Sequence, residues 1–377
     1  MAKRTNKRTY YDYALVFIVI FLTVFGLVMI YSASSYTAQL KYRDPSYFMV
    51  KQAEIAAIGF ALMIITSFID YHVILKFAAP LYAFSIALLL FVTFAGKEIN
   101  GRRRWIQIGS HTFQPSEVAK IALIILLAVV ISNIGQEINT WKGLMRVFAW
   151  DLPLALIVAY NNLSAGIIIF GIAFVMTFIV TDKKWIYALS AGAAVLLLIF
   201  VEPISKAMRA IGLLKEYQLS RILVWLEPEA HPLDGGYQVL QGLYAIGSGG
   251  LVGKGLGESI QKLGFVPEAQ NDMIFSIICE ELGLFGAISL ILIFLFMIYR
   301  FIVIANSAPD MYGSLICIGV MAHIAIQVIL NIAVVSNVIP NTGITLPFIS
   351  YGGTSVVFLM CEMGLALSVS RRIRLDY

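Results

Sequence analysis

Polar residues that could do chemistry are rare in this sequence, and the most prominent group combines three arginines with a lysine. Its members are Arg102, Arg103, Arg104, Gln114, Glu117 and Lys120. Glu117 and Lys120 are three residues apart, so on a helix that begins at Pro115 they share one face and can pair. Guanidinium and ammonium groups gathered in this way suit a phosphorylated, anionic lipid headgroup. Simple headgroup anchoring and a structural ion pair are the alternatives.

A long polar stretch, residues 202–272, contains two candidates for a general base. Asp234 precedes Gly235 and Gly236, whose backbone can bend close to a substrate. His231 is the other candidate, because an imidazole changes its charge near neutral pH. Either side chain could take a proton from an acceptor hydroxyl in a glycosyl or acyl transfer.

The same stretch carries a glycine-rich run around Lys254 that only partly matches a phosphate-binding P-loop. Lys254 is followed by Gly255 where the P-loop requires Ser or Thr, and Ser248 stands where its first glycine belongs. A nucleotide site is therefore not expected. The run forms either turns between amphipathic segments on the membrane surface or backbone amides that approach a phosphate or sugar.

Carboxylates also stand at the end of this stretch and within the apolar run behind it. Asp272 lies near the start of a helix, where we expect it to cap the helix. Glu280 and Glu281 lie roughly 12–13 Å further along a helix that rises about 1.5 Å per residue, at membrane depth. Carboxylates that deep face the protein interior or a water-filled cavity, and we expect these two to pair with Lys120 or an arginine.

The segment 336–355 combines prolines, glycines and hydroxyl residues, among them Thr345 and Ser350. This composition predicts that no regular helix forms there. Irregular backbone at membrane depth must be buried in protein or line a wet cavity, so the segment is either a cavity wall or a hinge.

These residues must be positioned by membrane helices, because the composition is too apolar for a water-soluble protein. Of the 377 residues, 60% are hydrophobic and 13% are charged, against roughly 25% charged in soluble domains. The same balance excludes disordered and coiled-coil chains. Runs of about 20 apolar residues predict transmembrane helices at 13–31, 53–69, 74–95, 118–134, 186–201, 273–299, 313–335 and 356–369.

One further apolar stretch, 152–181, is long for one span and short for two, and it is interrupted at Asn161 and Asn162. Basic residues flank both ends of the chain, so both ends should be cytoplasmic, which requires an even number of spans. We therefore split this stretch and predict an all-α polytopic membrane protein of about ten transmembrane helices. A basic N-terminus (1–12) and C-terminus (371–377) flank one membrane domain (13–370), with one large extracytoplasmic loop between spans 7 and 8.

In its motifs the chain resembles the SEDS family (shape, elongation, division and sporulation), which includes FtsW, RodA and SpoVE, over essentially its whole length. The matching motifs are Arg104-Trp105, Gln114-Pro-Ser-Glu117 with Lys120, Gly236-Tyr-Gln238, Ala245-Ile-Gly247, Gly253-Lys-Gly255, Pro267-Glu268 with Asp272, Glu280-Glu-Leu-Gly283 and Gly343-Ile-Thr-Leu-Pro-Phe-Ile-Ser-Tyr-Gly-Gly353. The resemblance implies ten spans with both ends inside the cell. It also implies a peptidoglycan glycosyltransferase that polymerises lipid II at the outer face of the bacterial cytoplasmic membrane and releases undecaprenyl diphosphate.

The resemblance further implies a biological setting and a binding site. The setting is cell division, elongation or sporulation, with a class B penicillin-binding protein, a transpeptidase, as partner. We expect lipid II to contact Arg102, Arg103, Arg104, Gln114, Glu117, Lys120, Gln238, Lys254, Glu280, Glu281, Thr345 and Ser350. No cofactor is evident, and the sequence leaves a divalent cation open.

Two departures from the family pattern remove carboxylates. Family members typically carry Pro-x-x-Asp-Pro-x-x-x-Gly-Tyr-Gln, whose Asp is the proposed catalytic residue. Here His231 stands at that position and Asp234 follows three residues later. We assign the base to Asp234, with His231 as the alternative. The family's Pro-Asp-Leu between the paired spans reads Asn161-Asn162-Leu163 here.

Two other functions fit parts of the sequence. A lipid II flippase would also have broken helices and charges near the midplane, although alternating access does not require the outer loop and its carboxylates. A non-catalytic scaffold that activates a partner synthase would explain the missing loop Asp.

Overall fold

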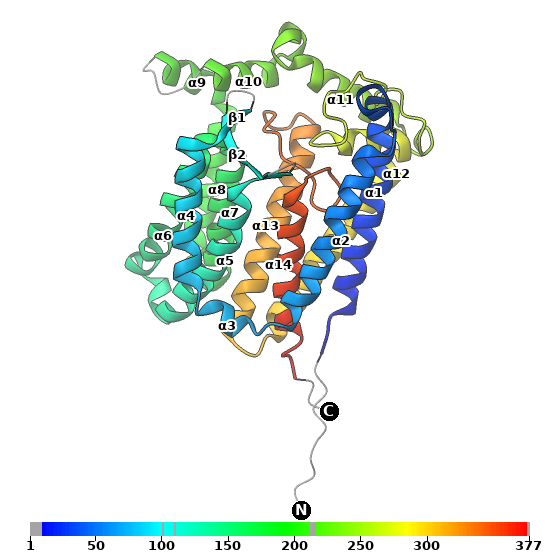
Figure 1. Cartoon of the computed structure of the whole chain (residues 1–377). Coiled ribbons are helices and arrows are strands. Elements are labelled where there is room, and N and C mark those ends of the chain that lie inside the picture. Colours follow the sequence, from blue (N-terminus) through cyan, green and yellow to red (C-terminus); the bar gives the residue numbers. More distant parts are fainter. Residues whose placement is uncertain (1–9, 100–101, 109–110, 211–215, 375–377) are drawn as a thin grey trace, which may run out of the picture.

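The chain is a bundle of membrane-length helices with shorter helices lying across one end (Figure 1). The computed structural model describes residues 10–99, 102–108, 111–210 and 216–374. In these ranges, eight helices are long and apolar enough to cross a membrane, and the two shorter apolar helices Lys184–Leu197 and Thr354–Ser370 bring the total to the predicted ten. The predicted all-α polytopic fold class is confirmed.

The helices follow one another with mostly short connections. In chain order they are α1 (Tyr13–Tyr42), α2 (Tyr47–Phe68), α3 (Tyr71–Leu75), α4 (Ala78–Ala95), α5 (Pro115–Ile134), η1 (Gly135–Asn139), α6 (Trp141–Asn161), α7 (Leu163–Val180), α8 (Lys184–Ile199), α9 (Val201–Ala210), α10 (Glu216–Leu226), η2 (Pro228–Ala230), η3 (Pro232–Asp234), α11 (Gly236–Ser248), α12 (Ile274–Ser307), α13 (Met311–Val335) and α14 (Thr354–Ser370).

The two described ends of the chain meet at the same end of the bundle. The backbone N–H of Tyr10 donates to the carbonyl of Ile373 at 3.1 Å. Asp12, which is fully buried, accepts from the guanidinium of Arg300 at 2.7 Å. Ends that lie on one side require an even number of spans, as the basic residues predict.

The stretch 152–181 is indeed divided between two helices, at Asn162. The side chain of Asn162 caps α7 by accepting from the N–H of Ala165 at 3.4 Å. However, α6 is longer than expected, because Thr140 caps its start by accepting from the N–H of Gly143 at 3.1 Å. The two spans have 21 and 18 residues, so each is long enough to cross the hydrocarbon.

The arginine cluster lies on a small antiparallel sheet that the sequence did not predict. Its strands are β1 (Lys97–Ile99), β2 (Arg102–Ile108) and β3 (His111–Phe113), in the order β1-β2-β3. Trp105, Ile106 and Ile108 favour an extended backbone in β2. The sheet joins α4 to α5 and lies near the end of the bundle covered by the shorter helices (Figure 1).

Helices α9 and α10 run across that same end of the bundle (Figure 1). Part of the long loop therefore forms helices that cover this end of the bundle. Two contacts hold α10 to the segment between α13 and α14: the indole N–H of Trp225 donates to the carbonyl of Asn337 at 3.0 Å, and Arg221 donates to that of Asn341 at 2.9 Å.

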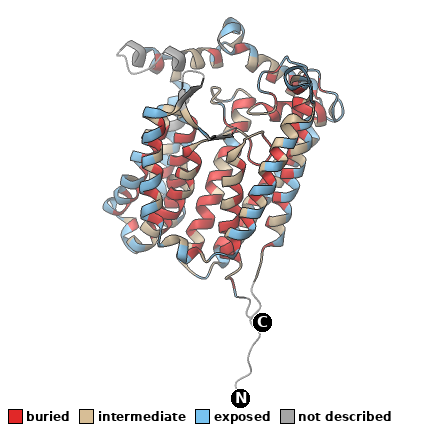
Figure 2. Ribbon diagram, viewed as in Figure 1, coloured by how far each residue is buried: buried red, intermediate tan, exposed pale blue. Residues whose placement is uncertain are grey.

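Buried residues gather on the central helices α13 and α14 and on the inward faces of the others (Figure 2). The outer faces carry exposed apolar side chains such as Phe17, Phe94 and Phe285. Apolar outer faces are expected where lipid tails replace water as the solvent.

Helix α12 is kinked at Gly283, whose φ is 66°. The kink interrupts the hydrogen bonds of the helix, and backbone groups of the loop before α12 take the place of the missing partners. The N–H groups of Lys254 and Gly255 donate to the carbonyls of Glu280 and Glu281, both at 3.0 Å. A Cβ on Gly283 would lie 2.3 Å from the backbone nitrogen of Gly253, so this close approach requires glycine.

Candidate active site

A polar cavity of about 530 Å³ opens near the outer end of the bundle. Its wall comes from elements far apart in the sequence: α2, β2, the start of α5, the α6–α7 junction, α10, the start of α11, the loop before α12, α13, and the segment between α13 and α14 with the start of α14. The charged residues that line it are Lys51, Arg104, Glu117, Lys120, Arg221, Glu268 and Asp272. Four cations therefore surround one hollow, which is an arrangement suited to a polyanion.

The predicted pair of Glu117 and Lys120 is confirmed. The Lys120 ammonium lies 2.9 Å from the Glu117 carboxylate, and their side chains are 3% and 9% exposed. Helix α5 begins at Pro115, as predicted, and this start places both residues within its first two turns. Because both residues line the cavity, a ligand bound there can reach this buried ion pair.

The other three cations come from three separate elements: Lys51 from α2, Arg104 from β2 and Arg221 from α10. Arg104 was predicted, whereas Lys51 and Arg221 were not. For Arg102 and Arg103 the structure describes the backbone of β2 but not the side chains, so their predicted contacts fall outside the described part of the chain. Gln114, Gln238 and Thr345, for which the sequence predicts contacts with lipid II, also line the cavity.

Asp272 faces the cavity and does not cap α12, contrary to the sequence-based expectation. The N-cap residue is Met273, and it makes no side-chain capping bond. The Asp272 carboxylate has one oxygen, Oδ1, without a hydrogen-bond partner among the described residues. Burial and, to a smaller extent, the neighbouring charge of Glu268 raise the pKa of Asp272 to about 7, although Arg221 and Arg104 act in the opposite direction. A carboxyl group that titrates near neutral pH is suited to general base catalysis.

The irregular segment between α13 and α14 forms one wall of the cavity. Of the two expectations from its composition, a cavity wall or a hinge, the structure shows the wall. Asn331 of α13 holds the wall in place, because its amide donates to the carbonyls of Ile344 and Asp272 at 2.7 and 2.9 Å. Ser350 is 2% exposed and does not line the cavity, contrary to its predicted contact with substrate. Its hydroxyl accepts from the N–H of Leu346 at 2.7 Å and so stabilises the segment.

Among the described residues, Glu280 and Glu281 pair with neither Lys120 nor an arginine, so that prediction is wrong. Both are fully buried, and they bind lysines of the loop before α12: Glu280 binds Lys254 at 2.7 Å and Glu281 binds Lys262 at 2.9 Å. Kinked α12 brings this loop against the two carboxylates, which the sequence does not reveal. Neither the glutamates nor Lys254 line the cavity. The glycine-rich run therefore docks the loop on α12 instead of approaching a phosphate.

Of the two predicted bases, His231 is described with its side chain, lies in the layer of short helices across the bundle and does not line the cavity. His231 connects η2 to η3, and its neighbour Leu233 is 99% exposed. For Asp234 the structure describes the backbone at the end of η3 and not the side chain. The sequence assigns the role of general base to Asp234. Among the described carboxylates, Asp272 fits that role, because it lines the cavity and its pKa is raised to about 7.

Several polar residues of the site were missed because they lie in apolar runs. His323 and Gln327 are on α13 and Glu362 is on α14, and all three are buried. The signal was present in the sequence, since an ionisable residue inside a span marks a functional position by default. Among the described residues, no three His, Cys, Asp or Glu gather closely enough to hold a metal ion.

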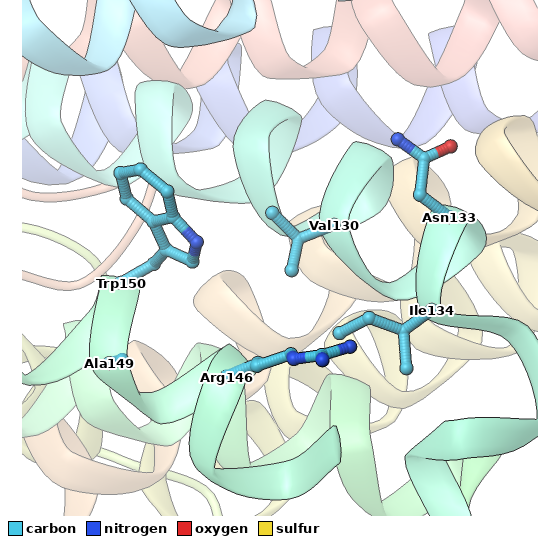
Figure 3. A pocket seen from close by; sticks show the side chains of 6 residues that line it. All are labelled: Val130, Asn133, Ile134, Arg146, Ala149 and Trp150. Atoms are coloured by element: carbon cyan, nitrogen blue, oxygen red, sulfur yellow. The ribbon is translucent and has the colours of Figure 1, made fainter. Parts of the chain in front are cut away.

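A second hollow, of about 490 Å³, lies at the opposite end of α5, between α5 and α6 (Figure 3). It is lined by Val130, Asn133, Ile134, Arg146, Ala149 and Trp150. Its one charged residue, Arg146, is paired with Glu137 at 2.6 Å. This hollow gathers no set of ionisable groups, and the outer cavity is the better candidate.

Known proteins resemble the chain over nearly its whole length. The model of the FtsW/RodA/SpoVE family, described as cell cycle proteins, matches residues 13–375. Stage V sporulation protein E of Bacillus subtilis is 38% identical over 98% of this chain and 100% of its own length. A protein of Geobacter sp. strain M18 named probable peptidoglycan glycosyltransferase FtsW is 36% identical over 97% of this chain and 98% of its own.

Solved structures share the fold. A chain from "Structural coordination of polymerization and crosslinking by a peptidoglycan synthase complex" superposes with a TM-score of 0.78 at 28% identity, covering 97% of this chain and 99% of that one. The rod shape determining protein RodA of Thermus thermophilus has a TM-score of 0.69 at 24% identity, covering 97% and 98% of the two chains. With a full-length family match and these relatives, the chain belongs to the FtsW/RodA/SpoVE family of polytopic membrane proteins.

Proposed function

We propose that the outer cavity holds the diphosphate of lipid II and that the chain polymerises lipid II there. The chain is a peptidoglycan glycosyltransferase of the bacterial cytoplasmic membrane that acts in division, elongation or sporulation. The observation that carries the proposal is the set of four cations, Lys51, Arg104, Lys120 and Arg221, around one hollow at the outer face. A diphosphate needs such a set, and a neutral sugar alone does not.

The cations act on the leaving group. In the transfer, the 4-hydroxyl oxygen of the acceptor sugar attacks the anomeric carbon of the lipid-linked chain, the bond to the diphosphate breaks, and the anomeric configuration inverts. Negative charge develops on undecaprenyl diphosphate as that bond breaks. Lys120 and Arg104, held in place before the reaction, stabilise this charge, and loss of one such group costs roughly 3–4 kcal/mol of barrier.

Asp272 is the base that the geometry supports best. It lines the same cavity as the cations, its Oδ1 makes no hydrogen bond among the described residues, and its pKa is raised to about 7. It can therefore take the hydroxyl proton at neutral pH. Asp234 and His231 remain the second candidates, because His231 stands at the position of the family's loop Asp.

We also propose a class B penicillin-binding protein, a transpeptidase, as the partner. The supporting observation is the TM-score of 0.78 with a chain of a peptidoglycan synthase complex. At the division septum or along the cell wall, such a partner would crosslink the strands that this chain produces.

The experiment is polymerisation of fluorescent lipid II by the purified chain in sealed vesicles, with and without its cognate transpeptidase. We expect glycan strands in both samples, with more product when the partner is present. Movement of lipid II across the bilayer without chain growth would instead identify a flippase. Strands formed by the purified chain without the partner would exclude a non-catalytic scaffold.

A further inference from the structure

A chain of buried ionisable groups leads from the cavity wall into the centre of the bundle. The Lys120 ammonium lies 2.9 Å from Nε2 of His323, and Nδ1 of His323 lies 2.7 Å from the Glu362 carboxylate. His323 and Glu362 are each 1% exposed. Neither lines the cavity, so neither touches a bound substrate directly.

The donors and acceptors of this chain assign the imidazole tautomer. An ammonium group has only N–H donors, so a hydrogen bond between Lys120 and Nε2 of His323 requires Nε2 to be the acceptor. The ring proton is then on Nδ1 and donates to Glu362. A buried carboxylate that accepts from one ring nitrogen fixes the tautomer and leaves the other nitrogen as an acceptor.

The alternative protonation has a different consequence. Gln327 Oε1 also lies 2.9 Å from Nε2, and its amide is held by a bond to the carbonyl of Thr345 at 3.0 Å. A proton on Nε2 would bond to Gln327 and present an N–H to Lys120, which would lose an acceptor. The imidazole therefore decides whether Lys120 has one acceptor, Glu117, or two.

We propose that Glu362 and His323 are positioning residues for Lys120. Glu362 fixes the tautomer of His323, and Nε2 of His323 holds the ammonium at the cavity wall between α5 and α13. This inference rests on the proposed function, because Lys120 is useful in that position only if the diphosphate leaves there.

A purely structural pair makes a different prediction. Replacing a buried polar pair by apolar residues is often neutral or stabilising, whereas removing one partner alone is costly. The double variant His323→Leu with Glu362→Leu should therefore fold, and it removes the second acceptor of Lys120. Met363→Leu, next to Glu362 on α14, is the matched core control.

We expect the double variant to keep its thermal midpoint in detergent and to lose about tenfold or more in the kcat of lipid II polymerisation, with a smaller change in KM. The loss falls on kcat because the charge that Lys120 meets grows in the transition state. His323→Gln should recover part of the rate lost by His323→Leu, since its side-chain carbonyl can accept from Lys120. If the double variant does not fold, the comparison of His323→Gln with His323→Leu serves as the test.

A double variant with wild-type kcat, or a His323→Gln variant no faster than His323→Leu, would overturn the inference. Lys120→Met separates this failure from failure of the proposed function. If Lys120→Met is inactive while the double variant is fully active, only the positioning role is wrong. If Lys120→Met polymerises normally, the proposed function itself is wrong.

Discussion

At the scale of single residues, the partners and positions of two paired lysines, Lys120 and Lys254, distinguish the site from the rest of the bundle. The ammonium group of Lys120 lies 2.9 Å from both Glu117 and His323. Lys254 is also paired with a glutamate, yet it lies away from the cavity. The two lysines look alike in the sequence, yet the structure places only Lys120 at the cavity.

We predict that Lys120→Met lowers lipid II polymerisation by about 100-fold or more, because the leaving diphosphate loses a preorganised cation. Lys254→Met is the matched control: it removes the same charge from a pair with Glu280 outside the cavity. It should lower the thermal midpoint while leaving the rate per folded molecule close to wild type. Equal losses of rate in the two variants would contradict the assignment.

A second prediction concerns the pH dependence of the reaction. Burial raises the pKa of Asp272 to about 7. A general base must be deprotonated, so the rate should rise from about pH 6 to 8 and level off above that range. Asp272→Asn should remove this rise and lower the rate by about 10²–10⁴-fold.

Glu268→Gln is the control for this profile. Because the charge of Glu268 contributes to the raised pKa of Asp272, its removal should move the rising limb to lower pH. If Asp272→Asn keeps the full rate and Asp234→Asn is inactive, the general base is Asp234 and not Asp272.

At the scale of elements, the kink in α12 determines where the loop before it can dock. Gly283 opens the helix, and the carbonyls of Glu280 and Glu281 then accept from Lys254 and Gly255. On the other side of the kink, Leu284 and Phe285 donate to carbonyls of the loop at 2.9 and 3.1 Å. The broken helix therefore leaves few unpaired groups, as a membrane interior requires.

Gly283→Ala should destabilise the protein by about 2–4 kcal/mol, since a Cβ at positive φ is strained and would overpack the loop backbone. The measurement is the midpoint of thermal unfolding in detergent. Gly192→Ala on α8 is the control: a Cβ there meets nothing within 4 Å and Ala is the better helix former, so the thermal midpoint should be unchanged or slightly higher. A thermal midpoint for Gly283→Ala equal to that of the control would show that the kink is not required.

At the scale of the whole molecule, the arrangement places the cavity at one face of the membrane and both chain ends at the other. The outer face carries the sheet and α9 to α11, and the inner face carries the contact between Tyr10 and Ile373 (Figure 1). Substrate that arrives from outside therefore meets the cations without crossing the bundle.

This orientation predicts which positions can be labelled from outside intact cells. In a variant whose three native cysteines are replaced, Leu233→Cys should react with a membrane-impermeant maleimide, because Leu233 is 99% exposed in the outer layer. Lys142→Cys, on the opposite side of the membrane at the start of α6, should react only after the cells are opened. The reverse labelling pattern would show that the orientation in the membrane is the opposite of this one.

The inner face also contains a pH-dependent contact between distant parts of the chain. His72 lies 2.8 Å from Asp70 and 2.9 Å from Asp310. Burial raises the pKa of each aspartate. Hydrogen bonds outweigh burial, from His72 to Asp70 and from Tyr71 and Gly313 to Asp310, so both pKa values lie below the ordinary 3.8.

Because the folded pKa values are depressed, these aspartates stabilise the fold above about pH 4, and the stabilisation is lost as the pH falls through the folded values. We expect the thermal midpoint in detergent to fall below pH 4. The fall should be shallower in the double variant Asp70→Asn with Asp310→Asn. An unchanged slope would mean that other carboxylates dominate acid unfolding.

The sequence predicted the elements of the fold well and the contacts of the site only in part. Ten spans, the division at Asn162 and the pair of Glu117 with Lys120 all follow from hydrophobic runs, from charge placement and from helical spacing, which are local properties. The sheet that contains Arg104 was missed, because a short hairpin among charged residues gives a weak pattern. The sequence position of Asp272 predicts a helix cap, whereas the structure places this residue at the cavity.

What the sequence by itself determined is the number of spans, their direction and the presence of cations near the outer face, since each depends on a run of neighbouring residues. Only the tertiary structure decided which charges meet. Lys120 lies beside His323, 203 positions further along the chain, and Glu280 lies beside Lys254 instead of a cation of the cavity. Pairing inside a membrane depends on which helices pack together and at what depth, and residue spacing along one chain does not contain that information.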